Sequence, residues 1–167
     1  MKTSQTHTYR NTNKLRYHQK ILLNIIKKDF KNKINGKILD IGCANGVFIK
    51  NLSNEFKKFE CTGIDTSSNM ITLAKKNKIK NLSFYKKDFM KYNKKLYFDI
   101  VIASGVLAFY DNFSKAIDKM ASFLKKNSNL YIFGTFNSHD IDTIVKFRNN
   151  YTKSDWEKGL NSFSIKR

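Results

Sequence analysis

Residues 38–48, which read ILDIGCANGVF, constrain the fold of this chain more than any other stretch. A short apolar run leads to an acid, Asp40, and a turn of small residues follows before an apolar helical pattern begins at Val47. A strand that passes through a tight turn into a helix places backbone N–H groups and a helix N-terminus against a nucleotide-like ligand. The acid before the turn favours a ligand with a positive or hydrogen-donating group there over a pyrophosphate.

Apolar periodicity along the whole chain predicts strands that alternate with helices. The expected strands are residues 37–41, 60–64, 82–85, 98–103 and 129–135, and the expected helices are residues 13–30, 46–56, 67–77, 111–124 and 140–150. Such alternation means βαβ units, right-handed crossovers and a sheet covered on both faces. We therefore expect an α/β fold, a doubly wound and mostly parallel sheet, in one domain of 167 residues.

The composition indicates a globular cytoplasmic protein. The chain is 41% hydrophobic, yet no apolar run approaches the roughly 18–20 residues of a membrane span, and the polar first 20 residues lack the apolar core of a signal peptide. The two cysteines, Cys43 and Cys61, do not have the paired spacing of a zinc site or a redox motif. We expect them to be buried reduced thiols, and we expect no metal.

The formal net charge of +19 raises the question of a nucleic-acid partner. However, 28 of the 32 basic residues are Lys and only four are Arg, and Asn is abundant while Pro is absent. This composition is typical of an AT-rich genome, whereas readout of phosphates and bases favours the forked side chain of Arg. The lysines are also scattered in pairs along the chain, as on solvated faces, so the sequence disfavours a nucleic-acid partner.

The ends of the expected strands carry the most informative side chains. In a doubly wound sheet, ligands bind beyond the carboxyl ends of the strands, beside the first strand. Three of these ends carry an acid, namely Asp40, Asp65 and Asp88, and the fourth end, residues 103–106, is small and contains a glycine. The sequence therefore predicts a ligand site at this edge.

This pattern resembles the class I S-adenosylmethionine-dependent methyltransferases, which have a Rossmann-like fold. The resemblance spans residues 38–136, and its first motif, an acid followed by alternating glycines, is found here as Asp40, Gly42, Ala44 and Gly46. The resemblance implies that S-adenosyl-L-methionine is the cofactor and that this loop, which includes Cys43, holds its methionine part. It also implies that Asp40 organises the loop or receives the cofactor's ammonium group.

The resemblance extends to the other strand ends. It implies that Asp65 accepts hydrogen bonds from both ribose hydroxyls, because the two oxygens of a carboxylate suit a vicinal diol. The run from Asp65 through Thr66 to Met70 looks like the family segment in which an apolar residue packs on adenine. Further positions match the adenine edge and the loop near the transferred methyl group, and they are Asp88, Phe89, Ala103 and Ser104.

Other interpretations of these residues remain open. Asp40 and Asp65 could be helix caps or turn residues, and Met70 taken alone fits a core position. A dinucleotide site is the main rival for the glycine turn, but that fingerprint requires GxGxxG, and Val47 occupies its third glycine position. The ordered series of acids at strand ends favours the methyltransferase interpretation.

The resemblance points to transfer of the methyl group to an O or N atom of a small molecule. The loop after the fourth strand lacks the (Asp/Asn/Ser)-Pro-Pro-aromatic sequence of enzymes that methylate exocyclic amines of bases. No residue is an obvious general base, and the weak candidates are His18 and Tyr17, on an N-terminal helix that is a candidate lid, and His139. A cofactor-binding but inactive domain is the alternative, and an RNA or protein methyltransferase is a weaker one.

The C-terminal region departs from the family pattern. The family's sheet has two further strands after the fifth, of which the last is antiparallel, and only residues 161–165 are expected to begin such a strand here. We therefore expect a sheet whose C-terminal strands are truncated. The sequence gives no indication of the oligomeric state.

Overall fold

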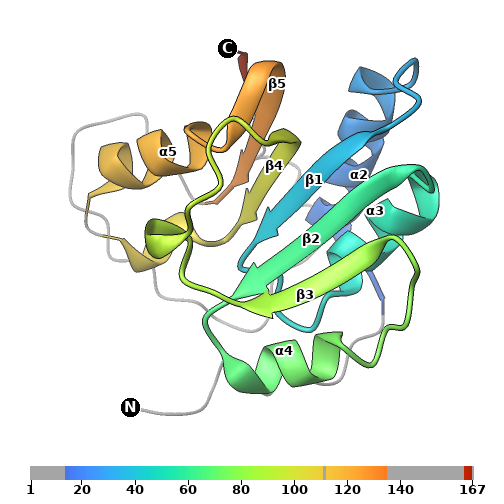
Figure 1. The fold of residues 1–167 in the computed structure, drawn as a ribbon, viewed down its shortest axis with the longest axis horizontal. Coiled ribbons are helices and arrows are strands. Elements are labelled where there is room, and N and C mark those ends of the chain that lie inside the picture. Colours follow the sequence, from blue (N-terminus) through green and yellow to red (C-terminus); the bar gives the residue numbers. More distant parts are fainter. Residues whose placement is uncertain (1–13, 111, 135–163, 167) are drawn as a thin grey trace.

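The computed structural model describes residues 14–110, 112–134 and 164–166 (Figure 1). Strands and helices alternate along the chain as predicted. The elements are α2 (Tyr17–Asp29), β1 (Gly36–Ile41), α3 (Val47–Glu55), β2 (Phe59–Asp65), α4 (Ser68–Ala74), β3 (Leu82–Lys86), η1 (Phe89–Lys91), β4 (Phe98–Ser104), η2 (Leu107–Phe109), α5 (Phe113–Ala121), β5 (Leu124–Phe133) and β6 (Ser164–Lys166).

The strands form one sheet in the order β3-β2-β1-β4-β5-β6. Strands β1 to β5 are parallel, and β6 pairs with β5 in the antiparallel direction. The chain adds strands first on one side of β1 and then on the other, so the winding direction reverses between β1 and β4. This confirms the predicted doubly wound fold and places the switch point beside the first strand, where ligands bind in such sheets.

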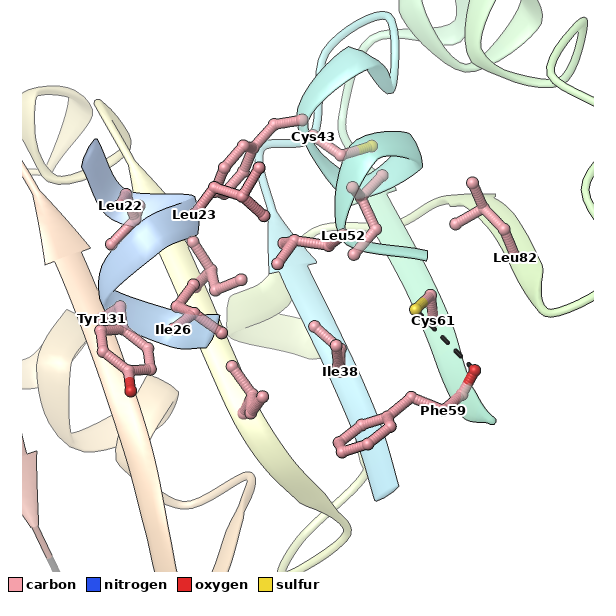
Figure 2. Close-up of a cluster of buried hydrophobic side chains, with 14 of the residues drawn as sticks. Leu22, Leu23, Ile26, Ile38, Cys43, Leu52, Phe59, Cys61, Leu82 and Tyr131 are labelled. Atoms are coloured by element: carbon pink, nitrogen blue, oxygen red, sulfur yellow. Dashed lines mark hydrogen bonds between the residues drawn. The ribbon is translucent and has the colours of Figure 1, made fainter. Parts of the chain in front are cut away.

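Two apolar clusters hold the helices on the sheet. On one face, side chains of α2, α3 and α4 pack against the central strands, and Figure 2 shows Ile26 of α2 and Leu52 of α3 beside Ile38 of β1, all three fully buried. On the other face, α5 packs through Met120 against a cluster that includes Val101 of β4. The core thus fixes β1 and β4 from both sides, and their carboxyl ends have a rigid base.

The second face is only partly covered by helices. The connection from β3 to β4, residues 87–97, crosses this face and contains only the 3₁₀ helix η1, whereas parallel crossovers usually carry an α-helix. In consequence β2 and β3 leave Glu60, Ser83 and Tyr85 exposed on this face. The expectation of cover on both faces is therefore met around β4 but not over β2 and β3.

Several predicted boundaries shift for identifiable reasons. Ser67 caps α4 as predicted, since its hydroxyl accepts a hydrogen bond from the Met70 N–H. The helix predicted at residues 111–124 is shorter because Asn112 caps it and Leu124 already belongs to β5. Strand β5 begins earlier than predicted because the polar residues 125–127 form an irregular stretch that hides its start.

The ends of the chain were predicted less well. Helix α2 begins at Tyr17 rather than at residue 13, and the helix predicted at residues 140–150 lies outside the described residues. The strand predicted at residues 161–165 corresponds to β6, which occupies residues 164–166. Its antiparallel direction corresponds to the last strand of the family pattern rather than to the one before it.

Candidate functional site

The loop of residues 42–46 turns the chain at the carboxyl end of β1. Gly42, Ala44 and Gly46 all have left-handed backbone conformations, with φ angles of 69°, 48° and 79°. The N–H groups of Gly42 and Cys43 both donate to the carbonyl oxygen of Ile64, over 2.8 and 3.0 Å. These bonds tie the loop to the carboxyl end of β2, so the loop is held in place by the neighbouring strand.

Packing requires glycine in this loop as strictly as the backbone does. A Cβ atom at Gly42 would lie 2.6 Å from Cγ2 of Val106, and one at Gly46 would lie 2.6 Å from the Phe84 ring. The two glycines therefore let the loop approach the segment after β4 on one side and β3 on the other. Close packing explains these glycines even without a ligand.

The Asp65 carboxylate connects the loop to the start of α4. Its Oδ2 accepts a hydrogen bond from the N–H of Ala44 over 2.9 Å, and its Oδ1 accepts one from the N–H of Ser67 over 2.8 Å. Asp65 is half-buried, and each carboxylate oxygen can accept a further hydrogen bond. Asp65 is therefore a turn residue, and its carboxylate can still accept hydrogen bonds from two hydroxyl groups of a ligand.

Asp40 is buried, and its side chain forms no hydrogen bond within the part of the chain that the structure describes. Only 3% of its surface is exposed, and no hydrogen bond from the described residues reaches its carboxyl group. Burial, and after it the negative charge of Asp65, raises the pKa of Asp40 to about 8. A buried polar group without a partner is costly, so this carboxyl group at the end of β1 suits a ligand that brings a cation or a donor.

Asp88 and Phe89 lie at the start of η1. The Oδ1 of Asp88 accepts a hydrogen bond from the N–H of Met90 over 2.9 Å, so this residue caps η1 while its side chain stays half-buried. The Phe89 ring is 3% exposed and meets the Tyr110 ring edge-on at 5.1 Å. Phe89 therefore forms part of the apolar core at this edge of the sheet.

The other predicted residues of the first two strand ends differ in exposure. Met70 is 6% exposed, whereas Thr66 is exposed at the surface. The Cys43 thiol is buried (Figure 2), and a Cβ atom at Gly63 would lie 2.9 Å from its sulfur. Burial raises the pKa of Cys43 well above its ordinary value. The Cys43 side chain therefore packs in the core, and its thiol donates a hydrogen bond to the carbonyl oxygen of Ala44 over 3.8 Å.

The segment after β4 borders open space. Ala103 is fully buried and Ser104 is half-buried. Gly105 has a φ angle of 73°, and no atom lies within 4 Å of the position a Cβ would take there. The Gly105 N–H donates to the carbonyl oxygen of Phe133 over 2.7 Å, which joins the ends of β4 and β5. This edge therefore has a fixed backbone with free volume beside it.

Of the candidate bases, the structure brings His18 to this edge. Its ring stacks on the Phe133 ring at the end of β5, with centroids 4.3 Å apart and planes 4° from parallel. Burial, and after it the charge of Arg16, lowers the pKa of His18 to about 4, so the imidazole is neutral near pH 7. Tyr17 is half-buried beside it, and His139 lies outside the described residues.

Sequence reasoning missed three residues that shape the site. Val106 and Phe84 contact the glycine loop, and Phe133 carries the stacked His18 ring. Their apolar side chains carry no chemical signal, and strand-end position was the only available hint. Among the described residues, no three His, Cys, Asp or Glu side chains gather as a metal site would need, and no helix is long and apolar enough to cross a membrane.

Comparison with known proteins agrees with this geometry. A curated relative from Bacillus anthracis, a malonyl-[acyl-carrier protein] O-methyltransferase, is 25% identical over 153 residues, which are 91% of this chain and 55% of the relative. A malonyl-[acyl-carrier protein] O-methyltransferase 2 from Ilyobacter polytropus is 30% identical over 141 residues, 83% of this chain and 52% of the relative. The chain thus spans about half the length of the curated relatives it matches.

Solved structures share the fold. The plantazolicin methyltransferase BpumL, crystallised with a pentazolic desmethylPZN analog and SAH, superposes with a TM-score of 0.64 at 21% sequence identity. The match covers 77% of this chain and 51% of that protein. A family described as "Methyltransferase domain" matches residues 32–163, which include the glycine loop and every strand end of the site. The chain therefore belongs to this methyltransferase domain family.

Proposed function

We propose that this protein binds S-adenosyl-L-methionine and transfers its methyl group to an O or N atom of a small molecule. The observation that carries the proposal is the buried, unpartnered carboxyl group of Asp40 at the switch point. The cofactor presents an ammonium group, and an opposite charge in this position stabilises a buried carboxylate. A pyrophosphate would instead bring a second negative charge beside Asp40 and Asp65.

The described residues fit the cofactor in order along the sheet edge. Asp40 and the loop of residues 42–46 hold the methionine part, and Asp65 accepts hydrogen bonds from the ribose hydroxyls. Asp88 accepts a hydrogen bond from the exocyclic amine of adenine. Thr66 and Met70, which follow β2, lie on the adenine side of the site in this proposal. The sulfonium group supplies an activated methyl and a good leaving group, so the protein's task is to position the acceptor and exclude water.

The acceptor lies on the other side of β1, in this proposal. Gly105 borders open space there, and its N–H is bonded to Phe133, on which the His18 ring of α2 stacks. Because the rest of α2 is packed in the core, we propose that only its first turn, with Tyr17 and His18, covers the site of a single cofactor-binding domain. The names of the curated relatives favour an oxygen acceptor, and a carboxylate acceptor would need no general base because it is already ionised. We also place the protein in the cytoplasm, with two free buried thiols.

Titration calorimetry with S-adenosylmethionine and with S-adenosylhomocysteine tests the cofactor. Asp65→Ala should weaken binding by roughly 1–3 kcal/mol, the cost of unpairing a buried polar group. The matched control is Asp118→Ala, because Asp118 is exposed on α5, away from the strand ends. Absence of binding at millimolar cofactor refutes the proposal, and equal effects of the two variants refute the role of Asp65.

Turnover then separates an enzyme from a binding domain. The protein is incubated with methyl-labelled cofactor and either a metabolite extract, a malonyl-loaded carrier protein or RNA. Label in the small-molecule fraction supports the proposed acceptor class, and label in RNA or protein replaces it. Binding without transfer in any fraction supports the alternative, a catalytically inactive domain.

A further inference from the structure

The uncovered part of the sheet forms an accessible surface, which we call the open face. It consists of strand residues of β1, β2 and β3 and two side chains of the connection to β4, namely Lys37, Glu60, Thr62, Ser83, Tyr85, Tyr92 and Tyr97. The strand residues lie side by side in the register, since Lys37 pairs with Glu60 and Thr62 pairs with Ser83. A parallel sheet that leaves one face exposed is unusual, so this surface calls for an explanation.

Aromatic rings gather on the open face. Tyr85 is 48% exposed although it stands in a strand. Tyr92 and Tyr97 are half-buried in the connection to β4, and both pack against the apolar cluster below this face. Together with Tyr85 they form the aromatic cluster of the open face. Tyr92 meets Phe123 edge-on at 5.7 Å and is anchored to the core by this contact. The cluster therefore joins one exposed ring to two rings fixed from below.

Positive charge surrounds these rings. The Lys37 ammonium lies 3.9 Å and the Lys94 ammonium 4.6 Å from the centroid of the Tyr97 ring. Lys87, after the end of β3, and Lys95, in the connection to β4, are also exposed, and with Lys94 we call them the rim. The single acid among the strand residues of the open face, Glu60, is paired with Lys37 over 3.2 Å. Lys37 and Lys94, which are far apart in the sequence, thus meet at the Tyr97 ring.

The charge limits what can cover the open face. A second copy of a chain with a formal charge of +19 would bring like charges together, which opposes association. A polyanion instead gains from every lysine of the rim. Sheets that bind single-stranded nucleic acid combine exposed aromatic rings, on which bases stack, with a positive groove for the backbone. Thr62 and Ser83 add hydroxyl groups between the rings and the rim.

From this juxtaposition we propose that the open face is a binding surface for single-stranded nucleic acid. Bases stack on Tyr85, and the phosphates lie against Lys87, Lys94 and Lys95. The scarcity of Arg means that binding does not depend on base sequence. This proposal does not rest on cofactor binding or methyl transfer, because it uses none of the residues that we assign to the cofactor.

Fluorescence anisotropy of labelled oligouridylate and oligothymidylate of about 12 nucleotides tests the proposal with the full chain, at about 50 and 200 mM salt. Tyr85→Ala should weaken binding at least about fivefold, because stacking contributes about 1–3 kcal/mol per base. Tyr85→Phe should stay within about twofold of the wild type, because it keeps the ring. If Tyr85→Ala unfolds, Tyr85→Thr removes the ring and keeps a strand-forming residue.

The rim lysines are tested by charge. The pair Lys94→Gln and Lys95→Gln should reduce the salt dependence of binding, while the pair Lys75→Gln and Lys76→Gln, at the end of α4 on the other side of the sheet, should leave it unchanged. Comparison of the two oligonucleotides shows whether the ribose hydroxyl contributes. Equal losses in both lysine pairs, no effect of removing the Tyr85 ring, or displacement by polyglutamate as effective as by unlabelled oligonucleotide would overturn the proposal.

Discussion

Replacement of Asp40 by Asn should stabilise the ligand-free protein and weaken cofactor binding at the same time. The pKa of Asp40 is raised from its ordinary value of 3.8 to about 8. The folded state therefore holds a proton between these pH values that the unfolded state releases. The contribution of Asp40 to stability is fully present below about pH 4 and is lost as pH rises toward 8.

The magnitude follows from the size of the shift. Each pKa unit corresponds to about 1.4 kcal/mol, so the unfavourable contribution of Asp40 at pH 7 is up to about 4 kcal/mol. The Asn variant has nearly the same shape and cannot ionise, and its unfolding free energy should exceed that of the wild type by up to this amount at pH 7. At pH 4 the difference should vanish.

Cofactor binding should show the opposite dependence on pH. If the ammonium group of the ligand pairs with ionised Asp40, a pKa of about 8 predicts an affinity that rises about 50-fold between pH 6 and pH 8. About one proton per ligand should leave at pH 7, which calorimetry in buffers of different ionisation enthalpy measures. The Asn variant should bind more weakly and with little pH dependence.

Urea unfolding at pH 4 and pH 7 measures the stability of the wild type, the Asp40→Asn variant and an Asp118→Asn control. The reasoning is refuted if the Asn variant gains no stability between pH 4 and pH 7 relative to the wild type. It is also refuted if S-adenosylhomocysteine binds with the same affinity at pH 6 and pH 8, because the buried carboxyl group would then not be coupled to the ligand.

Three further perturbations test the surrounding structure by thermal or urea unfolding. Gly46→Ala should reduce the free energy of unfolding by about 1–2 kcal/mol for its left-handed backbone and by more for the contact with the Phe84 ring. Gly105→Ala should show only the backbone cost, because its surroundings are open. Equal losses of stability in the two variants would contradict this reasoning. Between about pH 6.5 and pH 4 the unfolded state binds a proton at His18 and the folded state does not, so the wild type should lose stability as pH falls through this range. His18→Phe keeps the stacked ring and should remove this loss. An unchanged pH profile of stability would rule out His18 as its source. Burial alone would raise the pKa of Asp99, but hydrogen bonds from two Lys ammonium groups and a backbone N–H outweigh burial and lower the pKa. Asp99→Asn should therefore reduce the free energy of unfolding by about 1–3 kcal/mol at pH 7 and by progressively less in acid. A difference that stays constant with pH would show that these bonds do not depend on the charge of Asp99.

Local signals in the sequence were sufficient to predict the sheet, and they also predict the edge at which the candidate site lies. Strands and helices differ in apolar period, and the run around Asp40 showed both periods on either side of a turn. The order of acids at strand ends then located the candidate site, because the carboxyl ends of parallel strands necessarily share one edge. The same reasoning failed at β5, where polar residues in an irregular stretch interrupt the apolar pattern.

The environment of each site residue was beyond the reach of sequence reasoning. Asp40, Asp65 and Asp88 are the same residue type near strand ends. Among the described residues Asp40 is buried with no hydrogen bond to its carboxyl group, while the other two carboxylates accept backbone hydrogen bonds in turns. The sequence predicts Phe89 as a ligand contact but gives no sign that its ring is buried and meets Tyr110 edge-on. These differences arise from side chains of distant segments, which no local pattern specifies.

The sequence by itself determined which elements form, in what order, and at which edge the ligand site must lie, since these follow from period, turn residues and the handedness of crossovers. Tertiary structure alone decided which carboxyl group is deprived of solvent and partners, and which lysines and tyrosines become neighbours on the open face. The physical reason is that burial and electrostatic coupling depend on the packing of residues far apart in the chain. A crossover without an α-helix, residues 87–97, left that face exposed.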